Sequence, residues 1–149
     1  MKKIAVLLMS LLAFSSAKAD DLSVIAHGIS KHLENHNYNE RNYGGGLRYE
    51  NSEYGIQVGK YENSFRRETI YAGADWSPIH FNVHKCFNFQ SGVYAGVATG
   101  YKYNVTPMAG VQAAVRCKDV FLRLRVMPDI YYNTKAVGAI EIGLVLKRF

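Results

Sequence analysis

The residues of this sequence with the greatest capacity for chemistry are five histidines and two cysteines. His32 and His36 are four residues apart, as are His80 and His84. That spacing puts two imidazoles on one face only where the chain is helical, and neither segment has a helical pattern. Two cysteines are also too few for a structural zinc site. We therefore predict no metal and no cofactor.

The first residues are typical of a secretory signal peptide. Two lysines follow Met1, an apolar stretch runs from Ile4 to Phe14, and Ala17–Ala19 has the small-x-small pattern of a cleavage site. The apolar stretch is shorter than the roughly 20 residues that a membrane-spanning helix needs. The sequence thus predicts an exported protein, with a signal peptide at 1–19 and a single domain at 20–149.

Part of the positive charge belongs to this N-terminal segment. Removing it takes three lysines from the 18 basic residues and none from the 12 acidic ones, so the net charge falls from +6 to +3. The remaining basic residues are scattered. Such an excess suits anionic lipid head groups, or is ordinary solubilising charge, and it does not indicate a nucleic-acid partner.

The two cysteines have a simple interpretation in an exported chain. The compartment is oxidising, and Cys86 and Cys117 are the only possible pair within one chain. We expect one disulfide, with two free thiols as the alternative.

Beyond residue 19 the pattern is that of β-strands. Short alternating runs rich in Tyr, Val, Ile and Gly are separated by Asn, Ser, Asp and Pro. The predicted fold class is all-β: a small antiparallel up-and-down β-barrel of about eight strands, of the outer-membrane type. The expected strands are Leu22–His32, Tyr43–Glu50, Tyr54–Glu62, Arg67–Asn82, Phe89–Gly100, Met108–Cys117, Val120–Met127 and Val137–Phe149.

Alternation within these strands separates an apolar face from a charged one. The apolar face, which we expect to contact lipid, comprises Leu22, Val24, Ala26, Ile56, Val58, Ile70, Ala72, Ala74, Val111, Ala113, Val115, Val120, Leu122, Leu124, Val126, Ile140, Ile142, Leu144 and Leu146. The opposite face comprises Arg48, Gln57, Asp75, Gln112, Arg116, Arg123, Arg125 and Glu141. Charges there would be very costly against hydrocarbon but can pair inside a closed barrel. A soluble lipocalin-type barrel, with the faces reversed, is the alternative.

Connection lengths support a membrane barrel with two different ends. Tight turns at Asn51–Glu53 and Lys118–Asp119 alternate with longer connections at Leu33–Asn42, Tyr101–Pro107 and Pro128–Ala136, with Asn63–Arg66 as a short exception. This is expected when one end faces the periplasm and the other the exterior. With the chain starting in the periplasm, both cysteines fall at the periplasmic end of neighbouring strands, which favours the disulfide.

The last strand contains a conflict. A terminal Phe149 is typical of outer-membrane barrels, but the alternation from Ile140 to Leu146 would turn it inward. The sequence leaves the register of this strand open.

The stretch from Tyr38 to Gly46, Tyr-Asn-Glu-Arg-Asn-Tyr-Gly-Gly-Gly, resembles the lipid A palmitoyltransferase (PagP-like) family of outer-membrane β-barrels. The similarity continues through Lys60–Ser64, Ala72–Trp76, Pro78, Gly92–Val97, Met127-Pro128 and Phe149. The resemblance implies an eight-stranded barrel that transfers a palmitoyl chain from a phospholipid to lipid A.

The resemblance also implies a catalytic set at the outer rim. The family's His and Asp-Ser pair match His32, Asn63 and Ser64. Ser64 would be the nucleophile, His32 the base that takes its proton, and Asn63, which stands where the family has an acid, the orienting group. An Asn-Ser pair is also common in turns, which is the structural alternative.

Three hypotheses of function follow from these features. The leading hypothesis is an acyltransferase acting on phospholipid and lipopolysaccharide in the bacterial outer membrane. The alternative is a non-enzymatic surface or interaction barrel with a filled polar lumen, of a kind that a phage or mobile element could encode. Asp75 precedes Trp76 where the family has a glycine, and burying an acyl tail against charges is unfavourable, which favours the alternative. Lipid hydrolysis is a third class. A monomer is expected, because a closed barrel leaves no strand edge.

Overall fold

The computed structural model describes residues 20–33, 37–128 and 136–149. The signal peptide predicted at 1–19 lies outside this part of the chain. In the described residues, no helix combines the length and the apolar character that crossing a membrane would require.

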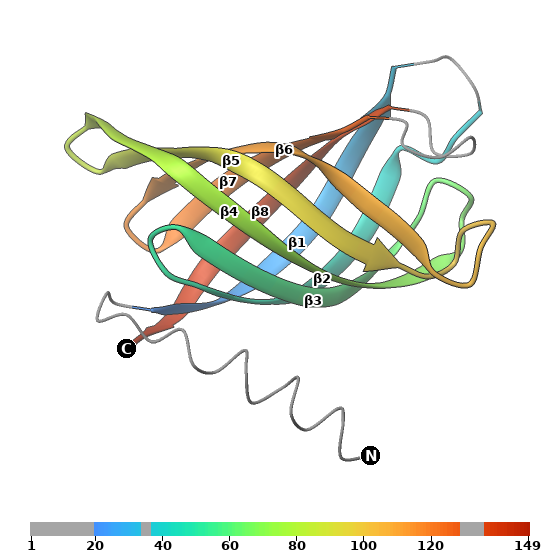
Figure 1. The fold of residues 1–149 in the computed structure, drawn as a ribbon, viewed down its shortest axis with the longest axis horizontal. Coiled ribbons are helices and arrows are strands. Elements are labelled where there is room, and N and C mark those ends of the chain that lie inside the picture. The colour runs from blue at the N-terminus through green and yellow to red at the C-terminus, as the bar shows by residue number, and fades with distance from the viewer. Residues whose placement is uncertain (1–19, 34–36, 129–135) are drawn as a thin grey trace.

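Eight antiparallel strands close into one barrel, in which each strand pairs with its sequence neighbours and β8 pairs with β1 (Figure 1). The predicted fold class is confirmed. The strands are β1 (Asp21–His32), β2 (Arg41–Glu50), β3 (Tyr54–Glu62), β4 (Glu68–His84), β5 (Phe87–Ala98), β6 (Thr106–Cys117), β7 (Val120–Met127) and β8 (Val137–Arg148).

The two ends of the barrel differ as predicted. The turns at 51–53, 85–86 and 118–119 lie at one end together with the C-terminus, and we call it the turn end (Figure 1). The connections at 63–67 and 99–105 lie at the other end, which we call the loop end, together with the end of β1, the start of β2, the end of β7 and the start of β8. Asn51 closes one tight turn, since its side-chain oxygen accepts hydrogen bonds from the backbone N–H groups of Glu53 and Tyr54.

Side chains alternate between the outer wall and the lumen. Val58 is 55% exposed and Leu122 is 52% exposed, whereas Arg48 and Arg123 are 2% and 1% exposed. The expected apolar outer face and charged inner face are both confirmed, and the lipocalin-type arrangement is excluded. An aliphatic exterior around a polar interior is the outer-membrane type of barrel.

An irregularity in the pairing of β1 with β8 decides the orientation of Phe149. Leu22 pairs with Lys147 but Ser23 pairs with Val145, so one residue of β8 is skipped and the alternation shifts. Phe149 is 62% exposed, just beyond the end of β8. The inward orientation expected from the alternation is therefore wrong, because a bulge reverses the face of the residues that follow it.

The two cysteines form the expected disulfide. Cys86 lies in the turn between β4 and β5, and Cys117 ends β6, with 4.8 Å between their Cα atoms. Phe87 and Cys117 are cross-strand partners, so the sheet itself brings the thiols together. The free-thiol alternative is excluded. The bridge ties the β4–β5 turn to β6.

Candidate functional site

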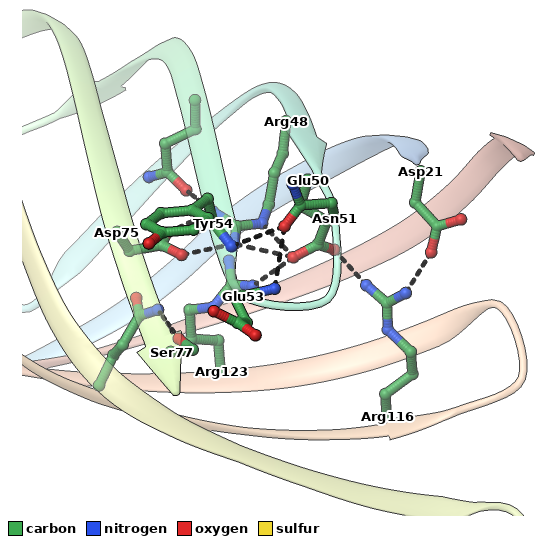
Figure 2. Close-up of polar contacts among 12 residues, drawn as sticks. Asp21, Arg48, Glu50, Asn51, Glu53, Tyr54, Asp75, Ser77, Arg116 and Arg123 are labelled. Carbon is green, nitrogen blue, oxygen red and sulfur yellow. Dashed lines mark hydrogen bonds and ion pairs between the residues drawn. The ribbon is translucent and has the colours of Figure 1, made fainter. Parts of the chain in front are cut away.

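The middle of the lumen is occupied by ion pairs rather than by open space. Arg48 donates two hydrogen bonds to the carboxylate of Asp75, at 2.6 and 2.9 Å, and a third to Glu50 at 2.8 Å (Figure 2). The two carboxylates come from different strands and approach the guanidinium from two sides. Bidentate contacts of this kind fix both position and orientation.

A second group of ion pairs is built around Glu141. Arg123 donates to one of its carboxylate oxygens at 2.7 Å, and Arg125 donates to the other at 3.0 Å. Both guanidinium groups also lie over aromatic rings, that of Arg123 over Phe121 at 4.8 Å and that of Arg125 over Tyr94 at 4.2 Å. These contacts join three strands, β5, β7 and β8.

Arg116 extends the ion pairs to the turn end, where it contacts both Asp21 and Glu50 (Figure 2). We give the name lumen network to these ion-paired residues of the described chain: Arg48, Arg116, Arg123, Arg125, Asp21, Glu50, Asp75 and Glu141. Its four cations balance four anions. The sequence pattern missed Asp21 and Glu50, although Glu50 lies two residues after Arg48 and so shares its face.

Glycine makes room for one of the large lumen side chains. The ring of Phe121 lies against Gly143 of the neighbouring strand, with which it pairs. A Cβ at this position would overlap the ring. Close packing of large side chains against a bare backbone fills the narrow interior.

At the loop end the structure brings together two of the three predicted catalytic residues. His32, at the end of β1, lies with its Nε2 2.7 Å from Oγ of Ser64, which follows β3. The backbone N–H of Asn39 donates to the carbonyl of Ser64 at 2.9 Å, which ties the first loop to this turn. The ring of Tyr38 packs against the imidazole at 4.4 Å. A serine hydroxyl within hydrogen-bond distance of an imidazole is one part of the arrangement that activates a nucleophile, and a group that orients the imidazole is the other.

Asn63 has a different place in the structure. Its side-chain nitrogen donates to Thr69 Oγ1 at 3.0 Å and to the carbonyl of Gly100 at 2.9 Å. Its side-chain oxygen accepts from the N–H groups of Phe65 and Arg67. These contacts close the turn rather than orient His32. Within the described part of the chain, Nδ1 of His32 is buried and has no hydrogen-bond partner.

A small cavity of about 80 Å³ lies below Ser64. Its lining is mainly aromatic and apolar, and includes Tyr61, Tyr71, Tyr94, Tyr101, Met108 and Met127. His27, which the sequence pattern did not single out, donates or accepts a hydrogen bond with the Tyr71 hydroxyl at 2.7 Å and lies 3.7 Å from Glu141. A cavity of about 150 Å³ holds one benzene molecule, so this one is limited to a few heavy atoms.

The remaining histidines do not assemble with other metal-binding side chains in the described ranges, where no three His, Cys, Asp or Glu residues cluster. His36 lies outside those ranges. His80 and His84 are both on β4, and the sulfur of the nearby Cys86 is bonded to Cys117 in the disulfide.

Comparisons with known proteins identify no family. No protein-family model matches the chain. No curated protein matches its sequence. Among solved structures, the chain is similar to Ail, the attachment invasion locus protein of Yersinia pestis, with 13% identity and a TM-score of 0.43 over 90% of this chain and 100% of that one. Membership of the lipid A palmitoyltransferase family stays a prediction from the sequence.

Proposed function

We propose that this chain is a bacterial outer-membrane barrel that acts through the surface it presents at its loop end. The observation that carries the proposal is the lumen network, which closes the interior with four guanidinium and four carboxylate groups. The aliphatic outer wall supports a location in hydrocarbon. With the lumen closed and the wall in lipid, we assign contact with molecules outside the cell to the loop end.

The lumen network also opposes the palmitoyltransferase hypothesis. An acyl chain lying along the lumen would have to displace Arg48, Asp75 or Glu141 from their partners, leaving charges buried without compensation. Breaking a buried pair in this way costs about 3–5 kcal/mol. The small cavity above the network has no room for a long chain.

The loop end suits an anionic partner. Arg41, Arg66 and Arg67 are exposed there, and Phe65 presents 44% of its surface. Guanidinium groups bind phosphate through paired hydrogen bonds, and aromatic rings are favoured at membrane interfaces. Both features support contact with lipopolysaccharide phosphates around the rim.

The test is expression of the full chain in a Gram-negative host, with phage adsorption, antibody access and lipid A mass as readouts. We expect the surface readouts to change without a change in lipid A mass. Replacing Arg66 and Arg67 by Gln should remove the effect, and the matched replacement Lys85→Gln at the turn end should leave it intact. Unchanged surface properties, or loss of the effect in the Lys85 variant alone, would contradict the proposal.

The contact between His32 and Ser64 favours a second candidate, acyl-ester chemistry at the rim. Ser64 Oγ would attack the ester carbonyl while His32 takes its proton, and that proton would pass to the departing alkoxide. Water or a hydroxyl acceptor would then release the acyl group from Ser64. The cavity below Ser64 suits a short acyl group better than a palmitoyl chain.

Purified protein in detergent, given p-nitrophenyl esters from acetate to palmitate and radiolabelled phospholipid with lipid A, tests this candidate. We expect turnover of short esters that falls by at least about 100-fold in Ser64→Ala and His32→Ala, in the range of a lost base. Ser52→Ala, in a turn at the opposite end, is the matched control. Absence of wild-type turnover would remove the candidate and leave the surface function standing.

A further inference from the structure

The longest strand of the barrel continues past its neighbour at the turn end. β4 has 17 residues and β3 has nine. Their pairing stops at Tyr54 and Trp76, and a last hydrogen bond joins the Ser77 N–H to the carbonyl of Glu53. Beyond that point β4 pairs only with β5, and the two strands project beyond the rest of the turn end (Figure 1). We call residues 77–91 the hairpin extension.

The hairpin extension has two different faces. Ile79, Phe81 and Val83 are 55%, 52% and 60% exposed, and Phe81 stacks on its cross-strand partner Phe89 at 4.6 Å. Asn82 and Asn88, on the opposite face, are hydrogen-bonded to each other. From residue 76 to residue 84 the sequence has no Asp, Glu, Lys or Arg. The β4 strand of the extension is amphipathic and carries no charged side chain of the kind that usually protects an exposed strand, and Lys85 lies in the turn that follows it.

The apolar face of the hairpin extension is continuous with the aliphatic wall of the barrel. Phe81 pairs with Phe89 and Phe89 with Val115. The same row continues across the next two strands, where Val115 pairs with Leu122 and Leu122 pairs with Ile142. An uninterrupted row of outward apolar side chains therefore joins the extension to the surface that faces hydrocarbon.

The length of this face places its end at the head groups. From Ile70 to Val83, at about 3.3 Å per residue, the outward apolar run of β4 measures roughly 43 Å along the strand. With a strand tilt of about 40° it spans about 33 Å along the barrel axis, compared with about 25 Å for the usual apolar band. The excess of about 8 Å is close to the thickness of one head-group layer.

We propose that the apolar face of the hairpin extension docks on the head-group region of the periplasmic leaflet, so that the barrel contacts more membrane on the β4–β5 side than elsewhere. The proposal rests on the membrane location given above. Water reaches backbone groups at this depth, so the unpaired edge of β4 is tolerated there, as it would not be in hydrocarbon. The disulfide fixes the extension against β6 and holds its apolar face in line with the wall.

A second copy of the chain does not suit this edge. Two barrels inserted in the same orientation run their β4 strands in the same sense across the membrane, and the tilt makes those strands cross rather than align. An extended segment of another protein could pair with the edge, but it would leave the phenylalanine face uncovered. Phospholipid is the partner that covers this face.

The single tryptophan of the chain, Trp76, provides the test. The full chain is inserted into phosphatidylcholine vesicles brominated at defined depths. Three proteins are compared: the wild type, W76F with F81W, and W76F with Y103W as a loop-end control. We expect bromines near the head groups to quench F81W at least twofold, with emission blue-shifted from that of Y103W.

Each outcome has a distinct meaning. Emission from F81W like that of a water-exposed tryptophan, with no quenching by lipid, would overturn the proposal while quenching of Trp76 still supported insertion. Blue-shifted emission without lipid quenching would also overturn it, because another polypeptide would then cover the face. Absence of quenching of Trp76 itself would contradict the membrane location.

Discussion

Arg48 and Asp75 meet across the intervening strand β3 through two hydrogen bonds of 2.6 and 2.9 Å, deep inside the barrel (Figure 2). Both side chains are almost fully buried, at 2% and 1% exposure. Such a pair stabilises a structure only while both partners are present, because either charge alone would be left in a poorly solvating interior. Replacing only one member of the pair is therefore expected to destabilise the barrel.

Replacing Asp75 by Asn should lower the free energy of unfolding by about 3–5 kcal/mol, since the Arg48 charge would lose its closest counter-charge. The measurement is urea unfolding in detergent micelles, followed by the fluorescence of Trp76. Joint replacement of Arg48 by Met and Asp75 by Leu should cost less than the single change. Glu68→Gln, in the exposed pair with Lys60, is the control and should change stability by less than about 1 kcal/mol. Equal effects of the buried and exposed changes would refute the role of the network.

Gly143→Ala should destabilise the barrel by about 1–3 kcal/mol, because the added methyl group overlaps the Phe121 ring. Phe121→Leu in the same chain should recover part of the loss by making space. Gly138→Ala, where nothing lies within 4 Å of the added atom, should be nearly neutral. Heat-dependent gel mobility and urea midpoints measure all three. A loss at Gly138 as large as that at Gly143 would show that strand propensity, not packing, governs both.

Tyr101 lies in the 99–105 connection, where burial raises the pKa of its hydroxyl. An unfolded tyrosine ionises near pH 10, so the stabilisation from the neutral form is complete below that pH and is lost as the pH rises through the higher folded pKa. Tyr101→Phe should cost about 1 kcal/mol at pH 7, since the hydrogen bond with the Tyr61 hydroxyl is lost. Between pH 10 and 11 the variant should lose less stability than the wild type. If the wild type and the variant lost the same free energy of unfolding between pH 10 and 11, the contribution of Tyr101 ionisation would be disproved.

Reduction of the Cys86–Cys117 bridge should lower stability by up to about 3–4 kcal/mol, the value expected from loop closure at a separation of 31 residues. The barrel should still close, because β5 and β6 remain paired along twelve residue positions. The Cys86→Ser, Cys117→Ser double variant should therefore keep its compact gel mobility and unfold at lower urea. A double variant that cannot fold at all would mean that the bridge acts during assembly.

Much of the architecture follows from alternation alone. The side-chain period of two assigns Leu122, Leu124 and Val126 to one face and Arg123 and Arg125 to the other, and only a closed barrel in lipid accommodates both. The same period and the chain order place the two cysteines together. They also place His32 and Ser64 at one end, since strands that run back and forth return their ends to the same rim.

Only the tertiary structure determines the register of the strands and which side chains contact one another across the lumen. A skipped residue in β8 turned Phe149 outward, and a pattern of period two contains no sign of where such a bulge falls. Long side chains contact partners across the lumen, and Arg116 on β6 thus contacts Asp21 on β1 and Glu50 on β2. Asn63 closed a turn because Gly100 came within reach of its amide. Alternation in the sequence predicts the face of a residue within a regular strand, whereas the positions of bulges and the distances between side chains across the lumen are determined only when the barrel closes.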